Sequence, residues 1–76
     1  MKKQGNAAFK AGDYPRAITL WTALINAGAG GEPGVGPAYV LFSNRSEANR
    51  RLGNHADALG DAQRALDLLA EAEAAA

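Results

Sequence analysis

Two stretches of this chain follow the same plan at an interval of 41 residues. Each contains a helix-length run, a break made of glycine followed by Asp or Asn, and a second helix-length run. The breaks are Gly12-Asp13 and Gly53-Asn54. Repeated helical hairpins stack, because one hairpin alone cannot bury its apolar face. The sequence therefore predicts an all-α domain of two stacked antiparallel helix-turn-helix hairpins, a design that presents a binding groove and rarely carries out chemistry.

Four helices are expected, over residues 2–11, 13–27, 38–52 and from 56 into an alanine-rich tail. The second helix has apolar residues at the i, i+3, i+4 and i+7 spacing of an amphipathic helix. Asp13 is expected to cap it. The third helix has four candidate buried residues: Tyr39, Leu41, Phe42 and Leu52. The fourth carries one apolar stripe: Ala58, Leu59, Ala62, Ala65, Leu66 and Leu69.

The domain organisation follows from these helices. Residues 1–76 form one domain, with a first repeat over 1–27, a Gly/Pro-rich extended loop over 28–37, a second repeat over 38–69 and an Ala/Glu-rich helical tail over 70–76. The loop has five glycines and two prolines, a composition that no helix or strand tolerates. It is either a flexible connector, which we favour, or a loop shaped by what it touches.

The charges exclude several classes of partner. Eight basic and eight acidic residues cancel, which argues against a nucleic-acid binder that works by neutralising phosphates. Residues 1–31 hold four basic residues against one acid, so the first hairpin either receives an acidic ligand or presents a solvated face. No apolar run approaches the ~20 residues of a membrane span. The polar residues after Lys2-Lys3 predict no signal peptide, and we expect a cytoplasmic protein.

Catalytic and metal sites are not expected, and neither is a cofactor. His55 is the sole histidine and the chain has no cysteine, so neither a metal set nor a nucleophile relay can be completed. Asp57 and Asp61 are explained by a solvated position near the start of the fourth helix, where the helix dipole favours acids. Arg45 with Arg50-Arg51 predicts a modest basic patch, which is too weak a signal for a DNA-reading helix. We therefore expect no enzyme.

The spacing of small and aromatic residues resembles the tetratricopeptide repeat family. The first unit matches its signature at Gly5, Ala8, Gly12, Tyr14, Ala17 and Trp21, and the second at Phe42, Ser46, Gly53, Ala58, Ala62 and Ala65. The resemblance implies a fragment of a right-handed α-solenoid that binds proteins. The chain departs from the family pattern at Leu24, where alanine is preferred, and at Asn49, where an aromatic residue or leucine is preferred. Its loop is also seven residues longer than the family period.

A narrower resemblance points to the co-chaperone branch of that family. Lys2-Lys3-Gln4-Gly5-Asn6 and Ser43-Asn44-Arg45-Ser46 reproduce the two stretches by which this branch grips the C-terminal Glu-Glu-Val-Asp tail of heat-shock chaperones. The resemblance implies an adaptor or co-chaperone with polar anchors at Lys2, Asn6 and Asn44. Four further candidates for peptide binding share the faces of these anchors: Phe9, Lys10, Glu47 and Arg50. Glu47 is expected to repel an acidic tail, and a generic protein-binding surface is the alternative.

The last helix suggests a function of another class. Two units without a capping helix leave Leu59, Leu66 and Leu69 uncovered, whereas repeat arrays usually end in a polar cap. Either further sequence covers this face, or it pairs with a second copy of the chain and the protein is a structural, self-associating scaffold.

Overall fold

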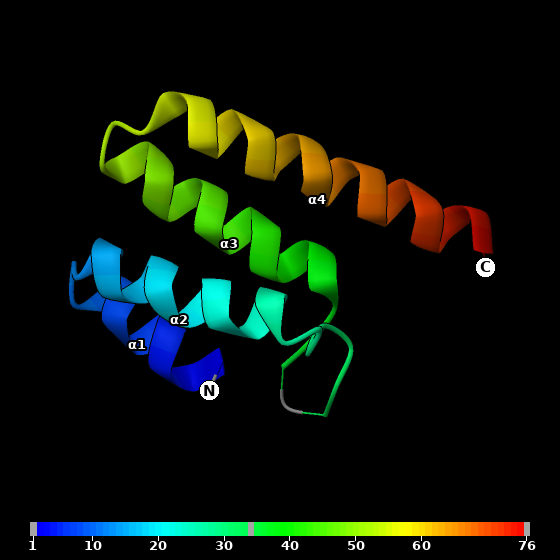
Figure 1. The fold of residues 1–76 in the computed structure, drawn as a ribbon, viewed down its shortest axis with the longest axis horizontal. Helices are drawn as coiled ribbons and strands as arrows, with labels where there is room; N and C mark the ends of the chain where they lie inside the picture. The colour runs from blue at the N-terminus through cyan, green and yellow to red at the C-terminus, as the bar shows by residue number, and fades with distance from the viewer. Residues whose placement is uncertain (1, 34, 76) are drawn as a thin grey trace.

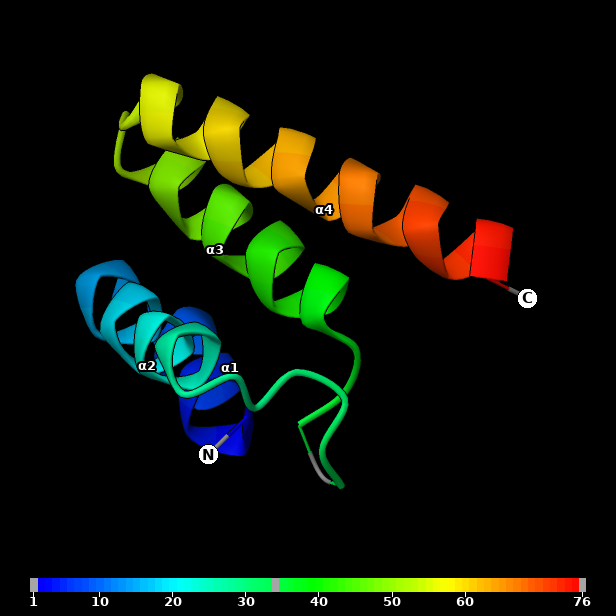
Figure 2. The same cartoon turned by 45° about the vertical axis from the view of Figure 1, so that its right-hand side comes forward.

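The computed structural model, which describes residues 2–33 and 35–75, has four helices and an all-α architecture (Figure 1). The helices are α1 (Lys2–Lys10), α2 (Tyr14–Asn26), α3 (Ala38–Arg51) and α4 (His55–Ala75). Each packs against the next in the chain, and both ribbon views place α3 between α2 and α4 (Figures 1 and 2). The predicted fold class of two consecutive helical hairpins is confirmed.

The two hairpin turns have the same geometry, 41 residues apart. Gly12 and Gly53 both have φ of 81°, in the left-handed region that glycine enters without a steric cost. The N–H of Asp13 donates to the carbonyl of Ala8 at 2.8 Å, and the N–H of Asn54 donates to the carbonyl of Asn49 at 2.9 Å. Glycine followed by a short polar residue therefore determines the same turn geometry in both repeats.

Small residues and two large side chains form the core between the hairpins. Ala17, Trp21, Leu41 and Ala48 are each at most 1% exposed. Trp21 lies directly against Gly5, since a Cβ added to that glycine would stand 2.4 Å from the indole Nε1. The closeness of α1 to α2 therefore depends on a glycine that faces the largest side chain of the domain.

Three leucines of the predicted apolar set lie outside the core. Leu52 is 42% exposed and follows the last residue of α3 as its C-cap. Leu59 and Leu66 are 73% and 62% exposed, because the neighbouring Ala58 and Ala65 supply the face that α4 packs against α3. These two leucines are uncovered, as the sequence predicted for a last helix without a capping unit.

The Gly/Pro-rich loop folds back on the end of α2. Ala29 and Val35 are buried in the core, and the N–H of Ala29 donates to the carbonyl of Leu24 at 3.0 Å. The N–H of Gly31 donates to the carbonyl of Gly36 at 2.7 Å, which closes the loop on itself. These contacts favour the second of the two alternatives, a loop shaped by what it touches, over the flexible connector.

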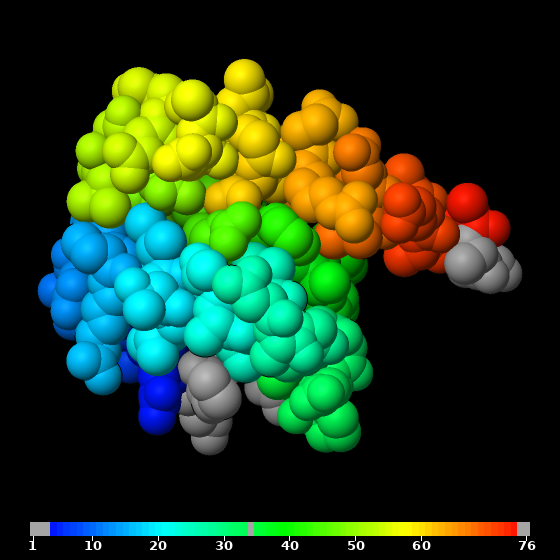
Figure 3. Space-filling view, in the orientation of Figure 1, coloured from blue at the N-terminus to red at the C-terminus, as the bar shows by residue number. Residues whose placement is uncertain are grey.

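The last turns of α4 continue through the alanine-rich tail and extend past the other helices (Figure 3). Alanine and glutamate have strong helix propensity, so this extension needs no packing partner in order to be helical. Within the described residues, no helix is long and apolar enough to cross a membrane.

Candidate functional site

A cavity of about 250 Å³ opens between α1 and α3. We call it the groove cavity, and it is lined by Asn6, Phe9 and Lys10 of α1, Trp21 of α2, and Asn44 and Glu47 of α3. Five of the seven predicted peptide-binding residues therefore surround one space. The side chain of Lys2 lies outside the described part of the structure, and Arg50 lies beside Glu47 without lining the cavity.

Trp21 is the lining residue that sequence reasoning assigned to packing alone. Its ring fills the core at 1% exposure while one edge closes the groove cavity, and it lies 6.1 Å from the ring of Phe9. Its Nε1–H is buried and has no hydrogen-bond partner among the described residues. The signal in the sequence was the pair of Trp21 and Gly5, because a large aromatic residue facing a glycine brings two helices close together. Such a residue can line the space between the helices as well as fill the core.

Two arginines hold the carboxylate of Glu47. The Nε of Arg50 donates to its Oε2 at 3.0 Å, and the Nε of Arg51 donates to its Oε1 at 3.0 Å. The hydrogen bond from Arg50 is the main reason that the pKa of Glu47 lies below its usual value, followed by the bond from Arg51. Glu47, Arg50 and Arg51, here called the charge cluster, therefore present a carboxylate that is ionised at neutral pH and neutralised by its neighbours.

Arg51 also ties the second hairpin to the turn of the first. Its Nη1 donates to the hydroxyl of Tyr14 at 3.3 Å, and its guanidinium lies 5.6 Å from the ring centre of Phe9. The rings of Phe9 and Tyr14 meet edge to face at 5.2 Å. Cation–π contacts of this kind are worth about 0.5–1 kcal/mol at exposed sites. Arg51 thus braces the aromatic wall of the groove cavity.

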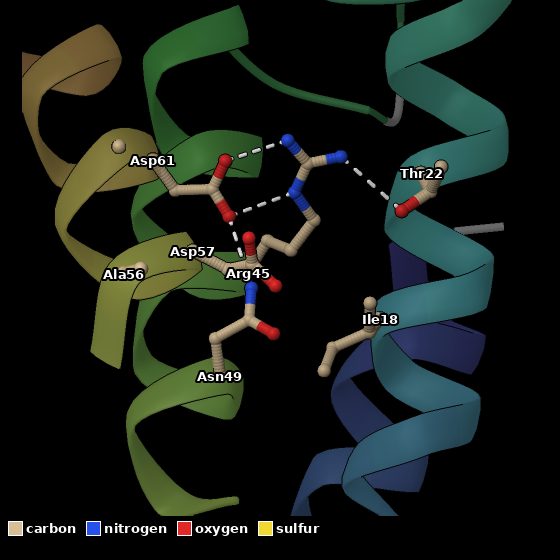
Figure 4. Close-up of a pocket in the computed structure, with 8 residues that line it drawn as sticks. Ile18, Thr22, Arg45, Asn49, Ala56, Asp57 and Asp61 are labelled. Atoms are coloured by element: carbon tan, nitrogen blue, oxygen red, sulfur yellow. Dashed lines mark hydrogen bonds and ion pairs between the residues drawn. The ribbon is translucent and has the colours of Figure 1, made fainter. Parts of the chain in front are cut away.

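A buried polar network connects three helices (Figure 4). Arg45 of α3 donates from Nη2 and Nε to the two carboxylate oxygens of Asp61 on α4, at 2.6 and 2.9 Å, and from Nη1 to the hydroxyl of Thr22 on α2 at 3.2 Å. Asn49 donates from Nδ2 to Asp61 Oδ2 at 3.1 Å. The prediction that Asp61 is a solvated acid was therefore wrong, because Asp61 is 7% exposed and its carboxylate accepts three hydrogen bonds.

The network also removes Arg45 from the predicted basic patch, because Arg45 is paired with Asp61. Arg50 and Arg51 share the single carboxylate of Glu47, so one positive charge of the patch remains. The network lies at the base of a second cavity of about 380 Å³ between α2 and α4, with Ile18, Ala56, Asp57 and Gly60 on its walls. Its bonds join residues of the fold to one another, so we assign it a structural role.

His55 is exposed at the start of α4, as expected of a turn residue. In the part of the chain that the structure describes, no group of three or more His, Cys, Asp or Glu side chains is placed to hold a metal ion.

Comparison with known proteins identifies relatives among co-chaperones. The chain is 48% identical over 61 residues, or 80% of its length, to heat shock protein STI1 of Saccharomyces cerevisiae. It is 40% identical over 68 residues to Hsp70-Hsp90 organizing protein 2 of Arabidopsis thaliana, and 34% identical over 67 residues to sperm-associated antigen 1 of Homo sapiens. These alignments span 9%, 10% and 6% of the respective relatives. No family model and no solved structure matches the chain.

Proposed function

We propose that this chain, which is homologous over most of its length to a segment of the tetratricopeptide repeat co-chaperones of the Hsp70-Hsp90 organizing kind, is a protein-binding module that holds an extended peptide in the groove cavity. The observation that carries the proposal is the meeting of Asn6 and Asn44 at one cavity. These two asparagines come from the two stretches that resemble the co-chaperone branch. Two of the relatives are named heat shock protein STI1 and Hsp70-Hsp90 organizing protein 2, and we accordingly propose a binding role for this chain and no catalytic one.

The ligand that we propose is the acidic C-terminal tail of a heat-shock chaperone, ending Glu-Glu-Val-Asp. A terminal carboxylate needs convergent donors, and the side-chain amides of Asn6 and Asn44 supply them with the ammonium group of Lys10 nearby. No hydrogen bond within the described residues occupies either amide. The partly exposed ring of Phe9 offers apolar surface beside these donors, with the buried Trp21 behind it, which suits the valine of such a tail. The name of the Arabidopsis relative refers to Hsp70 and Hsp90, and we propose a cytoplasmic location for this chain.

Binding of the free C-terminal carboxylate is the result that tests this proposal. A peptide ending Glu-Glu-Val-Asp is titrated beside the same peptide amidated at its C-terminus, by calorimetry or by the fluorescence of Trp21, the sole tryptophan. We expect Asn6→Ala or Asn44→Ala to weaken binding of the free acid by about 10-fold to 100-fold, since hydrogen bonds to charged groups contribute about 1.5–3 kcal/mol.

Asn26→Ala is the matched control, because Asn26 is an exposed asparagine at the end of α2, away from the cavity. It should bind the free acid as the unmodified protein does. Equal binding of the free acid and the amide would refute carboxylate recognition and leave a generic peptide-binding surface. Binding of neither peptide would refute the proposed ligand.

A structural scaffold is the second candidate function, and the repeat register favours it. Ile18 and Ile25 of α2 are partly buried against the core, where α3 covers the first hairpin. The residues 41 positions later are Leu59 and Leu66 of α4, which are exposed. The third predicted interface residue, Leu69, is half-buried. A second copy that covers this face would reproduce on α4 the packing that α2 already has.

Self-association through this face predicts a concentration-dependent sedimentation coefficient. Leu59→Gln combined with Leu66→Gln should raise the dimer dissociation constant at least about 100-fold, because burial of each leucine contributes about 1.5–3 kcal/mol. Gln63→Ala on the same helix is the control. A protein that stays monomeric up to millimolar concentration would contradict the scaffold and leave peptide binding unaffected.

A further inference from the structure

The charges at the rim of the groove cavity are unevenly distributed. Lys10 and Glu47 are the two charged side chains among the residues that line the groove cavity. Glu47 is held by Arg50 and Arg51, so at this rim one carboxylate stands among three cations. Excess positive charge attracts acidic groups, and the attraction acts over about 8–10 Å at physiological salt.

The two arginines of the charge cluster differ in how far they are committed to the fold. Arg51 spans Glu47 and Tyr14 and lies over two aromatic rings, which fixes it as part of the wall. Arg50 bonds Glu47 alone among the described residues, and its side chain is 59% exposed. A guanidinium has five N–H donors. Arg50 uses two of these donors on Glu47, so three remain without a partner among the described residues.

Glu47 itself is a poor acceptor for a ligand. Both of its oxygens already accept hydrogen bonds from guanidinium groups, and its pKa is lowered for that reason. Its remaining effect is on Arg50, which it holds through two bonds in a forked arrangement one helical turn along α3. A guanidinium that is held in place loses less conformational entropy when it binds an acid than a free side chain does.

We propose that Arg50 recognises an acidic side chain of the bound peptide, upstream of its terminal carboxylate, and that Glu47 is the positioning residue that orients it. This inference rests on the proposed function and adds a determinant of ligand specificity to it. Arg50 of α3 thereby supplies a cation for the acidic residues of the ligand, and no third hairpin is needed for it. Glu47 then favours the acidic ligand that its own charge alone would repel.

The test compares two peptides with the same free C-terminus, one ending Glu-Glu-Val-Asp and one ending Gln-Gln-Val-Asp. Arg50→Gln should weaken binding of the first about fivefold and leave the second within twofold, since exposed charge pairs contribute up to about 1 kcal/mol. Arg50→Lys should lie between, because it keeps the charge and loses the fork. Arg64→Gln, which removes an exposed arginine of α4, should change neither affinity.

The role of Glu47 is measured by repeating the comparison in a Glu47→Gln background. Arg50→Gln should then cost less than about twofold with the Glu-Glu peptide, because the guanidinium is no longer oriented. A full fivefold effect there would show that Glu47 does not position Arg50. Equal weakening of both peptides by Arg50→Gln, or no weakening, would overturn the inference while carboxylate recognition stands. If the unmodified protein binds neither peptide, the proposed function fails and this inference fails with it.

Discussion

Replacement of Asp61 by asparagine is expected to lower the free energy of unfolding by about 2–4 kcal/mol. The carboxylate accepts three hydrogen bonds from Arg45 and Asn49 and is almost fully buried. Removal of its charge leaves the guanidinium of Arg45 partly buried without an anion, and loss of one partner of such a pair is strongly destabilising. Since small domains have only about 0.05–0.15 kcal/mol of stability per residue, a large part of the total would be lost.

Urea denaturation followed by circular dichroism measures this effect. Asp67→Asn is the matched control, because Asp67 is exposed on the same helix and, among the described residues, accepts a hydrogen bond from Gln63 alone, at 3.0 Å. It should change stability by less than about 0.5 kcal/mol. Arg45→Gln combined with Asp61→Asn should cost less than the sum of the single changes, because two neutral amides can bond each other. Additive costs would contradict the role of the pair.

The turns of this fold were predictable because they are local. A glycine at the end of a helix and a short polar residue after it determine the chain direction without help from distant residues. The structure therefore repeats at Gly53-Asn54 the hydrogen bonds of Gly12-Asp13. Helix bounds agreed to within one or two residues, and alanine and glutamate continue α4 to Ala75, as expected of a helical tail.

The polar network was not predicted because its partners are 16 and 23 residues apart in the sequence. The sequence did contain a signal for this network, namely polar residues at positions where the helix pattern expects buried apolar ones. Asn49 replaces an apolar residue of the family pattern, and Asp61 lies between Ala58 and Ala65 on the face that packs against α3. Two polar residues on facing helices are expected to meet, since burial without partners costs about 1–3 kcal/mol for each group. Neither residue alone identified the other.

The ion pairs of the charge cluster, in contrast, can be predicted from residue spacing alone. Arg50 and Arg51 follow Glu47 by three and four residues, the intervals at which side chains on one helix meet. The expectation that Glu47 repels an acidic ligand treated it as an isolated charge. The geometry of the groove cavity, in contrast, needed the angle between two hairpins, and that angle depends on the packing of Trp21, Leu41 and Ala48. Peptide binding there stays a prediction.

Replacement of Trp21 by alanine should destabilise the domain by about 3–5 kcal/mol and eliminate the groove cavity as a defined space. The indole is 1% exposed and belongs both to the core and to the cavity wall. Loss of a large buried aromatic removes its transfer free energy and leaves a void that a four-helix domain can refill only in part. Trp21→Phe should cost less than about 1.5 kcal/mol, because it keeps a ring and removes a buried N–H that has no partner.

Gly5 supplies the sharpest test of how Trp21 acts. In the unmodified protein, Gly5→Ala places a Cβ 2.4 Å from the indole Nε1 and should destabilise by about 1–3 kcal/mol through overpacking. In the Trp21→Phe background the contact with Nε1 is gone, but a ring carbon stays near the place of Cδ1, which is 2.9 Å from the added Cβ, so Gly5→Ala should destabilise by less than in the unmodified protein. The cost of Gly5→Ala therefore falls when the indole at position 21 is replaced by a phenyl ring. Urea denaturation of the four proteins by circular dichroism measures the coupling, and a Gly5→Ala effect that is equal in both backgrounds would show that the glycine is not there to admit the tryptophan.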